Sequence, residues 1–263
     1  MIPRLRSLAL PPEHGSWGFL MEALLLGLVA APSAAGAGIA IAGTATFLAR
    51  HPVKLVISDA MRRRLFPRTP WALGFVALYG GLAAAAALGT LVLTRQPFWL
   101  PLLLAAPLAL AQLAGDVLGK GRTLFAEMVG AALPGALASS IALAGGWAAG
   151  PAFALWAILA VRALAAILHV RTRLRVDRGA VTRTSLILPA AAYALGACLV
   201  VLLARAGLAP WTGPAVLAAL LLRVVAEIAI PARPVRPQAL GLREMSIGLA
   251  SALLIGLGYR LRA

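Results

Sequence analysis

The chain alternates long apolar runs with short polar breaks along its whole length. Apolar runs of about 15 to 24 residues are long enough to cross the hydrocarbon core of a bilayer as helices. Nine such runs are present, at approximately 17–31, 34–49, 71–94, 98–114, 128–144, 151–168, 186–204, 211–230 and 245–261. Proline, glycine and charged residues separate them, as in Arg95-Gln96-Pro97 and Gly150-Pro151. The pattern predicts an all-α, polytopic membrane helix bundle that forms one transmembrane domain over residues 1–263.

The composition agrees with a membrane protein and excludes other classes of protein. Of the 263 residues, 62% are hydrophobic and only 12% are charged, against roughly 25% charged in an ordinary soluble domain. Such a chain is neither a soluble domain nor intrinsically disordered. Its single cysteine, Cys198, also excludes a disulfide scaffold.

The surplus of basic residues predicts the orientation of the bundle. The chain has 24 Lys and Arg against 8 Asp and Glu, a net charge of +16. In so apolar a chain we assign this surplus to membrane topology, with membrane lipids as partners and no role for nucleic acid. With the N-terminus in the cytoplasm, 18 basic residues fall in cytoplasmic segments, 4 on the other side, and Arg162 and Arg223 inside spans. We therefore expect a cytoplasmic N-terminus.

The first apolar run has two interpretations. Two arginines precede it and a small-residue stretch follows it at 30–34, as in a cleaved signal peptide. However, Glu13, His14 and Glu22 border or interrupt its apolar core. These polar residues favour an uncleaved first helix.

The same three residues form the first polar cluster. His14, Gly18 and Glu22 recur at i, i+4 and i+8, so one helix face would carry an imidazole, a gap for close approach and a carboxylate. A carboxylate within a span is costly unless it is paired or functional. Glu22 is thus either the partner of an Arg on a neighbouring helix or, with His14, a candidate catalytic group. Glu13 is a candidate substrate-binding residue.

A second polar cluster follows the second span. If Pro52 opens a helical turn, as proline prefers, four polar residues fall on one stripe at offsets 0, 3, 7 and 11. The stripe comprises His51, Lys54, Ser58 and Arg62. A basic stripe of this kind also serves as a topology signal. His51 and Asp59 are candidate catalytic groups, and Lys54 and Arg62 are candidate ligands for a substrate.

A third cluster closes the sixth span. One stripe runs from inside the span to its cytoplasmic end and comprises Arg162, Ala166, His169 and Arg173. Arg171 and Arg175 follow on the same segment, and Arg162, His169, Arg171 and Arg175 are candidate substrate-binding residues. His51 and His169 each precede a basic residue at the end of an even-numbered span, 118 positions apart. Such an echo is typical of membrane proteins with a ligand site between two repeated halves.

The other charges have simpler explanations. Asp116 with Lys120, and Arg223 with Glu227, are spaced as i, i+4 pairs that would neutralise each other. Glu127 and Glu244 are expected at helix starts, where the helix dipole favours a carboxylate. No His or Cys pair has zinc spacing, and we expect no metal site.

Several motifs resemble those of one bacterial family. They are Glu13-His14-Gly15-Ser16-Trp17-Gly18, Arg50-His51-Pro52-Val53-Lys54-Leu55, His169-Val170-Arg171 and Gly241-Leu242-Arg243-Glu244. On these residues the chain resembles the YwiC-like family of bacterial membrane proteins, which implies a multi-pass protein of the inner membrane and adds no mechanism.

A more distant resemblance is to the UbiA superfamily of intramembrane prenyltransferases. That superfamily implies nine helices and Asp-rich magnesium motifs at the cytoplasmic ends of helices 2 and 6. At those two places this chain retains only Asp59 and Asp177. The loss of the other carboxylates argues against magnesium as a cofactor.

Two functions follow as hypotheses. In the first, the protein binds an isoprenoid or other anionic-headed lipid in a cytoplasm-facing cavity, as a divergent UbiA-like transferase or without catalysis. Basic side chains would clamp the head, and His14 or His51 would act as general acid or base. In the second, the protein is a non-catalytic transporter or an accessory subunit of a membrane complex. Charged residues within spans would then form a relay, namely Glu22, Arg162, Arg223 and Glu227.

Overall fold

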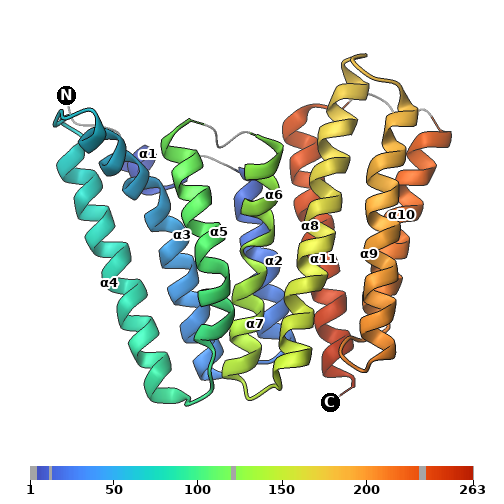
Figure 1. The fold of residues 1–263 in the computed structure, drawn as a ribbon, viewed down its shortest axis with the longest axis horizontal. Coiled ribbons are helices and arrows are strands. Elements are labelled where there is room, and N and C mark those ends of the chain that lie inside the picture. The colour runs from blue at the N-terminus through green and yellow to red at the C-terminus, as the bar shows by residue number, and fades with distance from the viewer. Residues whose placement is uncertain (1–4, 12–13, 120–122, 231–234, 263) are drawn as a thin grey trace.

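The computed structural model describes residues 5–11, 14–119, 123–230 and 235–262, and all regular structure within these ranges is helical (Figure 1). A short helix α1 (Leu5–Ala9) comes before the long ones. The remaining elements are α2 (His14–Ala30), α3 (Ala34–Met61), α4 (Thr69–Leu93), α5 (Trp99–Val117), α6 (Leu124–Ala132), α7 (Gly135–Ala144), α8 (Ala149–Asp177), η1 (Arg183–Leu186), α9 (Ile187–Arg205), α10 (Thr212–Ala229) and α11 (Pro237–Arg260).

Each predicted span corresponds to a helix, and α6 and α7 together form the fifth. Within the described residues, seven helical segments are long and apolar enough to cross a membrane. The other two are α2, with 17 residues, and α3, whose 28 residues continue into a polar segment. The all-α membrane fold is therefore confirmed, and the count of about nine spans is approximately right.

Helix α3 extends further than its apolar run because nothing in the polar segment stops it. The Ser33 side chain caps its start by accepting a hydrogen bond of 2.9 Å from the backbone N–H of Gly36. Pro52 lies inside the helix, which ends only at Met61. Pro52 therefore does not open a new helical turn, and the polar stripe from His51 to Ser58 lies in the last part of α3, with Arg62 just beyond its end.

The fifth crossing is broken between α6 and α7. Pro134 has no backbone N–H and cannot continue the ladder of helical hydrogen bonds. The indole Nε1 of Trp156, on α8, donates a hydrogen bond of 2.9 Å to the carbonyl oxygen of Ala132 at the break. Gly135 leaves space for that indole ring. A membrane-embedded break is tolerated in this way because a neighbouring helix satisfies the exposed backbone.

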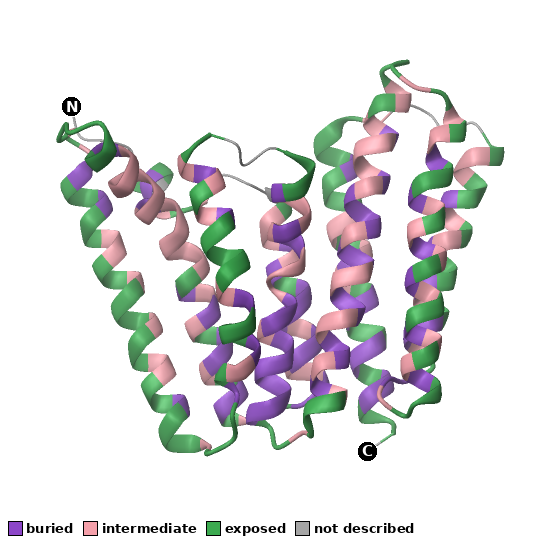
Figure 2. Cartoon of the chain, viewed as in Figure 1, coloured by how far each residue is buried: buried purple, intermediate pink, exposed green. Residues whose placement is uncertain are grey.

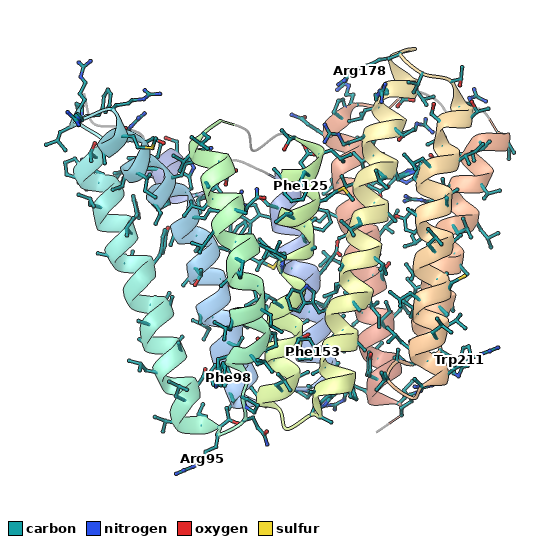
Figure 3. All side chains as sticks on the ribbon, in the orientation of Figure 1. Arg95, Phe98, Phe125, Phe153, Arg178 and Trp211 are labelled. Carbon is teal, nitrogen blue, oxygen red and sulfur yellow. The ribbon has the colours of Figure 1, made fainter. Side chains whose placement is uncertain are left out.

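The helices run between two ends of unequal charge. We call the end that carries Arg178 and the N-terminus the basic end, and the end that carries Arg95, Trp211 and the C-terminus the opposite end (Figures 1 and 3). Within the described residues, the arginines at the opposite end are Arg95, Arg205, Arg260 and Arg262. This division of charge is the one predicted from the sequence.

The core lies around α7 and α8. Buried residues concentrate there in the half of the bundle nearer the opposite end (Figure 2). In the most apolar 18-residue window of α8, 56% of residues are buried, against 6% in α4. Helix α4 therefore packs at the periphery, mainly on α3, and presents most of its apolar surface to the surroundings.

Candidate functional site

The polar stripe predicted on α8 is one buried face of that helix. Arg162, Ala166, His169 and Arg173 are all at most 5% exposed. Arg173 follows Arg162 by 11 residues, which is about 16 Å along the helix axis. The stripe thus carries charged groups from the interior of the bundle toward the basic end.

The deepest of these groups forms an ion pair. Nη2 of Arg162 donates a hydrogen bond to Oε2 of Glu22 on α2, and each side chain is 3% exposed. Gly248 on α11 faces this pair, and a Cβ atom at that position would overlap the Glu22 carboxylate. The interpretation of Glu22 as the partner of an Arg on a neighbouring helix is confirmed.

A second ion pair joins α10 to α11. Nη1 of Arg223 lies 2.8 Å from Oε1 of Glu244, and its Nη2 donates a hydrogen bond of 3.2 Å to Oε2. The predicted i, i+4 partner, Glu227, acts on Arg223 electrostatically, whereas the ion pair itself is made with Glu244. Glu244 is also not at a helix start, because α11 begins seven residues earlier, at Pro237.

His169 lies among these charged groups. Its Nε2 atom is 3.6 Å from Oε2 of Glu227 and 4.0 Å from Oε1 of Glu244. Toward the basic end, Arg173 donates hydrogen bonds of 3.2 Å to Glu227 and 3.0 Å to Asp177. The partners of the α8 stripe therefore come from α2, α10, α11 and α8 itself.

Tyr193 completes the site, and sequence reasoning missed it. Its side chain on α9 is 1% exposed and lies within electrostatic reach of the Glu22–Arg162 and Arg223–Glu244 pairs. A lone tyrosine in an apolar span gives no signal that distinguishes it from a packing residue. We call the whole set the charge cluster: Glu22, Arg162, His169, Arg173, Asp177, Tyr193, Arg223, Glu227 and Glu244.

The charge cluster contains buried polar atoms that lack hydrogen-bond partners within the described residues. They are Nε of Arg162, Nδ1 and Nε2 of His169, the hydroxyl of Tyr193 and Nε of Arg223. Buried polar groups are normally satisfied, and each exception calls for an explanation such as a bound ligand, water or ion. The cluster can therefore accept further polar partners.

The predicted site residues on α3 have a different environment. Nε2 of His51 lies 3.1 Å from the carbonyl oxygen of Ser7. Buried Asp59 accepts hydrogen bonds of 2.7 Å from Arg68 and 2.8 Å from Thr69. Hydrogen bonding from Arg68 holds the pKa of the Asp59 carboxyl below its usual value. Asp59 thus ties the end of α3 to the start of α4.

The two polar stripes are not brought together. Helices α5 and α6 lie between α3 and the basic end of α8, so His51 and His169 belong to different regions (Figure 1). Glu13 lies outside the described residues, as does the side chain of His14. Of the residues predicted on the first two spans, the structure places only Glu22 in the charge cluster.

The remaining carboxylates pair with arginines. Asp116 accepts a hydrogen bond of 2.8 Å from Nε of Arg50, and its predicted partner Lys120 lies outside the described residues. Glu127 is in the first turn of α6, as predicted, and pairs at 3.1 Å with Arg171. Every carboxylate in the described ranges therefore contacts a guanidinium. In the same ranges, no three His, Cys, Asp or Glu side chains group as a metal site would require.

Fold and site together define a multi-pass helical membrane protein with a charge cluster buried inside its bundle. The chain belongs to the YwiC-like family, because the model of YwiC-like proteins matches residues 10–142. That match covers α2 to α7 and includes Glu22, and the rest of the charge cluster follows it in the chain. Comparison with curated proteins and with solved structures gave no match.

Proposed function

We propose that this protein is a non-catalytic membrane transporter in which the charge cluster takes up and releases protons. One observation carries the proposal: five helices each place an ionisable side chain in one buried cluster. These are Glu22 on α2, Arg162 on α8, Tyr193 on α9, Arg223 on α10 and Glu244 on α11. Ionisable residues inside a membrane bundle are costly and typically mark ion pathways and proton relays.

The cluster holds several groups that can accept a proton. It contains four carboxylates and three guanidinium groups, and the exposed Arg243 of α11 also acts electrostatically on His169. A proton bound here would reside on His169 or on one of the carboxylates. A low-dielectric interior strongly disfavours an uncompensated charge. His169 is well placed to share this proton, because two carboxylates lie within 4.0 Å of its Nε2 atom.

Side-chain exposure supports proton uptake from the basic end. Glu22 is 3% exposed, whereas Glu244 and Glu227 are 11% and 12% exposed. The cluster is therefore more accessible near the basic end and more occluded at its deepest point. We propose that the basic end faces the cytoplasm of a bacterium and that the protein lies in the inner membrane, as an excess of arginine at one end favours.

Proton flux in liposomes tests this proposal. The purified protein is reconstituted into vesicles that contain a pH-sensitive dye, and a pH gradient is imposed across the membrane. We expect Glu22→Gln and Glu227→Gln to lower proton flux about tenfold or more, because each removes a group that can carry a proton. Glu127→Gln is the matched control, since its carboxylate is 36% exposed and lies outside the cluster. That variant should keep the wild-type rate.

Two results would contradict transport of protons. One is wild-type flux no faster than in protein-free vesicles, and the other is unchanged flux in both cluster variants. Thermal unfolding of each variant in detergent shows whether a loss of flux reflects a loss of folding. A loss of flux in both variants with unchanged unfolding temperatures assigns the effect to the missing carboxylates.

A second candidate function is the binding of an isoprenoid or other anionic-headed lipid at the basic end. The observation in its favour is that Lys54, Arg62 and Arg175 form no ion pair with a carboxylate of the described residues. Basic groups near a membrane surface attract anionic headgroups. Mass spectrometry of lipids that copurify with the protein tests this candidate. Their loss in the Lys54→Ala and Arg175→Ala variants is expected, and equal amounts would contradict it. A UbiA-like transferase activity would further require that the protein converts such a lipid into a detectable prenylated product.

A further inference from the structure

A pocket of about 470 Å³ opens at the opposite end of the bundle, and the charge cluster does not line it. It lies between the turn that joins α2 to α3, the turn that joins α7 to α8, and the end of α11. Its lining consists of Ala30, Ala31, Pro32, Gly145, Trp147 and Arg260. Binding sites for small molecules typically have volumes of roughly 300 to 1,000 Å³. The pocket is therefore of a size to hold one small organic molecule.

The lining favours a ligand with a negative charge. Among the described residues, Arg260 is its one charged residue and no carboxylate side chain lines the pocket. Trp147 supplies an apolar wall, and its ring lies 5.1 Å from that of Tyr259. The hydroxyl of Tyr259 donates a hydrogen bond of 3.0 Å to the carbonyl oxygen of Leu208, which fixes this wall. A guanidinium beside an indole matches an anionic group on a small apolar body.

The pocket is aligned with the charge cluster along the contact between α2 and α11. Ala30 follows Glu22 by eight residues, which is about 12 Å along α2. Between them the two helices meet in an apolar layer. Leu26 and Ile255 are at most 1% exposed, and Val29 packs against Gly256 so closely that a Cβ atom there would lie 2.9 Å from Val29 Cγ1. About two helical turns of apolar side chains therefore separate the pocket from Glu22.

We propose that this pocket is a binding site for a small organic anion. Resting on the proposed function, we further assign this anion as the solute that crosses with the protons. An anion and a proton together carry no net charge, so they pass an apolar layer at a lower electrostatic cost than either alone. Unpartnered N–H groups of Arg162 and Arg223 supply donors for the anion within the charge cluster.

Charged thiol reagents test the anion site directly. In a Cys198→Ala background, a Pro32→Cys variant places one thiol in the pocket. Its reaction rates are measured with methanethiosulfonate reagents that carry either a sulfonate or a trimethylammonium group, each normalised to its rate with free cysteine. We expect about a tenfold preference for the sulfonate reagent, of the order that one positive charge within a few ångströms produces in water. Adding Arg260→Gln should abolish the preference.

Arg95→Gln is the matched control, because Arg95 lies at the same end but does not line the pocket (Figure 3). It should keep the tenfold preference. Equal normalised rates for the two reagents at Pro32→Cys, or a preference that survives Arg260→Gln, would overturn the anion site. These labelling rates do not depend on transport. A protein without proton flux can still prefer the sulfonate reagent, and a protein with proton flux can show no preference, so the two proposals can fail separately.

A lipid comparison identifies the source of the anionic group. The same labelling is performed in nanodiscs of phosphatidylcholine with and without phosphatidylglycerol. Retained labelling in both excludes the phosphatidylglycerol headgroup as the occupant and leaves a water-soluble anion, as proposed. Protection by phosphatidylglycerol alone would assign it to a lipid headgroup and overturn the assignment of the anion as a transported solute.

Discussion

Replacing Arg162 by methionine is expected to lower the free energy of unfolding by about 3 to 5 kcal/mol, the usual result of removing one partner from a buried ion pair. The loss is large because Glu22 would remain as an uncompensated carboxylate in a site where its side chain is 3% exposed. Methionine fills similar space with an apolar chain, so the change isolates the charge. Unfolding of the purified protein in mixed micelles measures the effect.

The ion pair makes two further variants informative. The double variant Glu22→Gln, Arg162→Met removes both charges and should recover most of the loss. Arg171→Met, on the same helix, breaks a pair whose side chains are 40% and 36% exposed, and should change stability by no more than about 1 kcal/mol. Equal destabilisation by Arg162→Met and Arg171→Met would contradict a special role for the buried pair.

Gly248→Ala is expected to have the second largest effect, with a loss of about 1 to 3 kcal/mol from overpacking. The added Cβ atom would overlap the Glu22 carboxylate and lie 3.0 Å from Nη2 of Arg162. The ion pair would have to shift in a closely packed site. The shift in midpoint of unfolding in mixed micelles, converted to free energy, measures this loss.

Gly241→Ala is the control for the glycine substitution. It lies on the same helix, and a Cβ atom there would meet nothing within 4 Å. Alanine in an exposed helical position should raise stability by roughly 0.5 to 1 kcal/mol. In a background of Glu22→Ala and Arg162→Met, where the carboxylate is absent, Gly248→Ala should become nearly neutral. Strict additivity of these changes would show that Gly248 and the ion pair are not coupled.

The apolar runs predicted the helices well because span length is set by the thickness of the bilayer. Helix boundaries were less predictable, as α3 shows. The polar segment after residue 49 contains no strong helix breaker other than Pro52, and the helix accommodates that proline. Apolar content determines where the chain is buried in lipid, whereas helix ends depend on capping and on contacts with neighbours.

For the site, the periodicity of polar residues along one helix predicted which of them share a face. It did not predict their partners on the other helices. The stripe of Arg162, His169 and Arg173 follows from the spacing of residues on a helix. The partner of Arg223 depends on which helices are adjacent, so the local spacing that pointed to Glu227 did not reveal the ion pair with Glu244. Tyr193 was missed for the same reason, because its role is visible only once α9 packs beside the charged helices.

The ion pair between Glu22 and Arg162 also constrains the order of events during synthesis. The two residues are 140 positions apart in the chain. At 5 to 20 residues per second, a ribosome needs about 7 to 28 seconds to make that stretch. During this interval the Glu22 carboxylate on α2 has no arginine partner from α8, because Arg162 has not yet been synthesised. The first crossing therefore reaches its final state only after the sixth has been made.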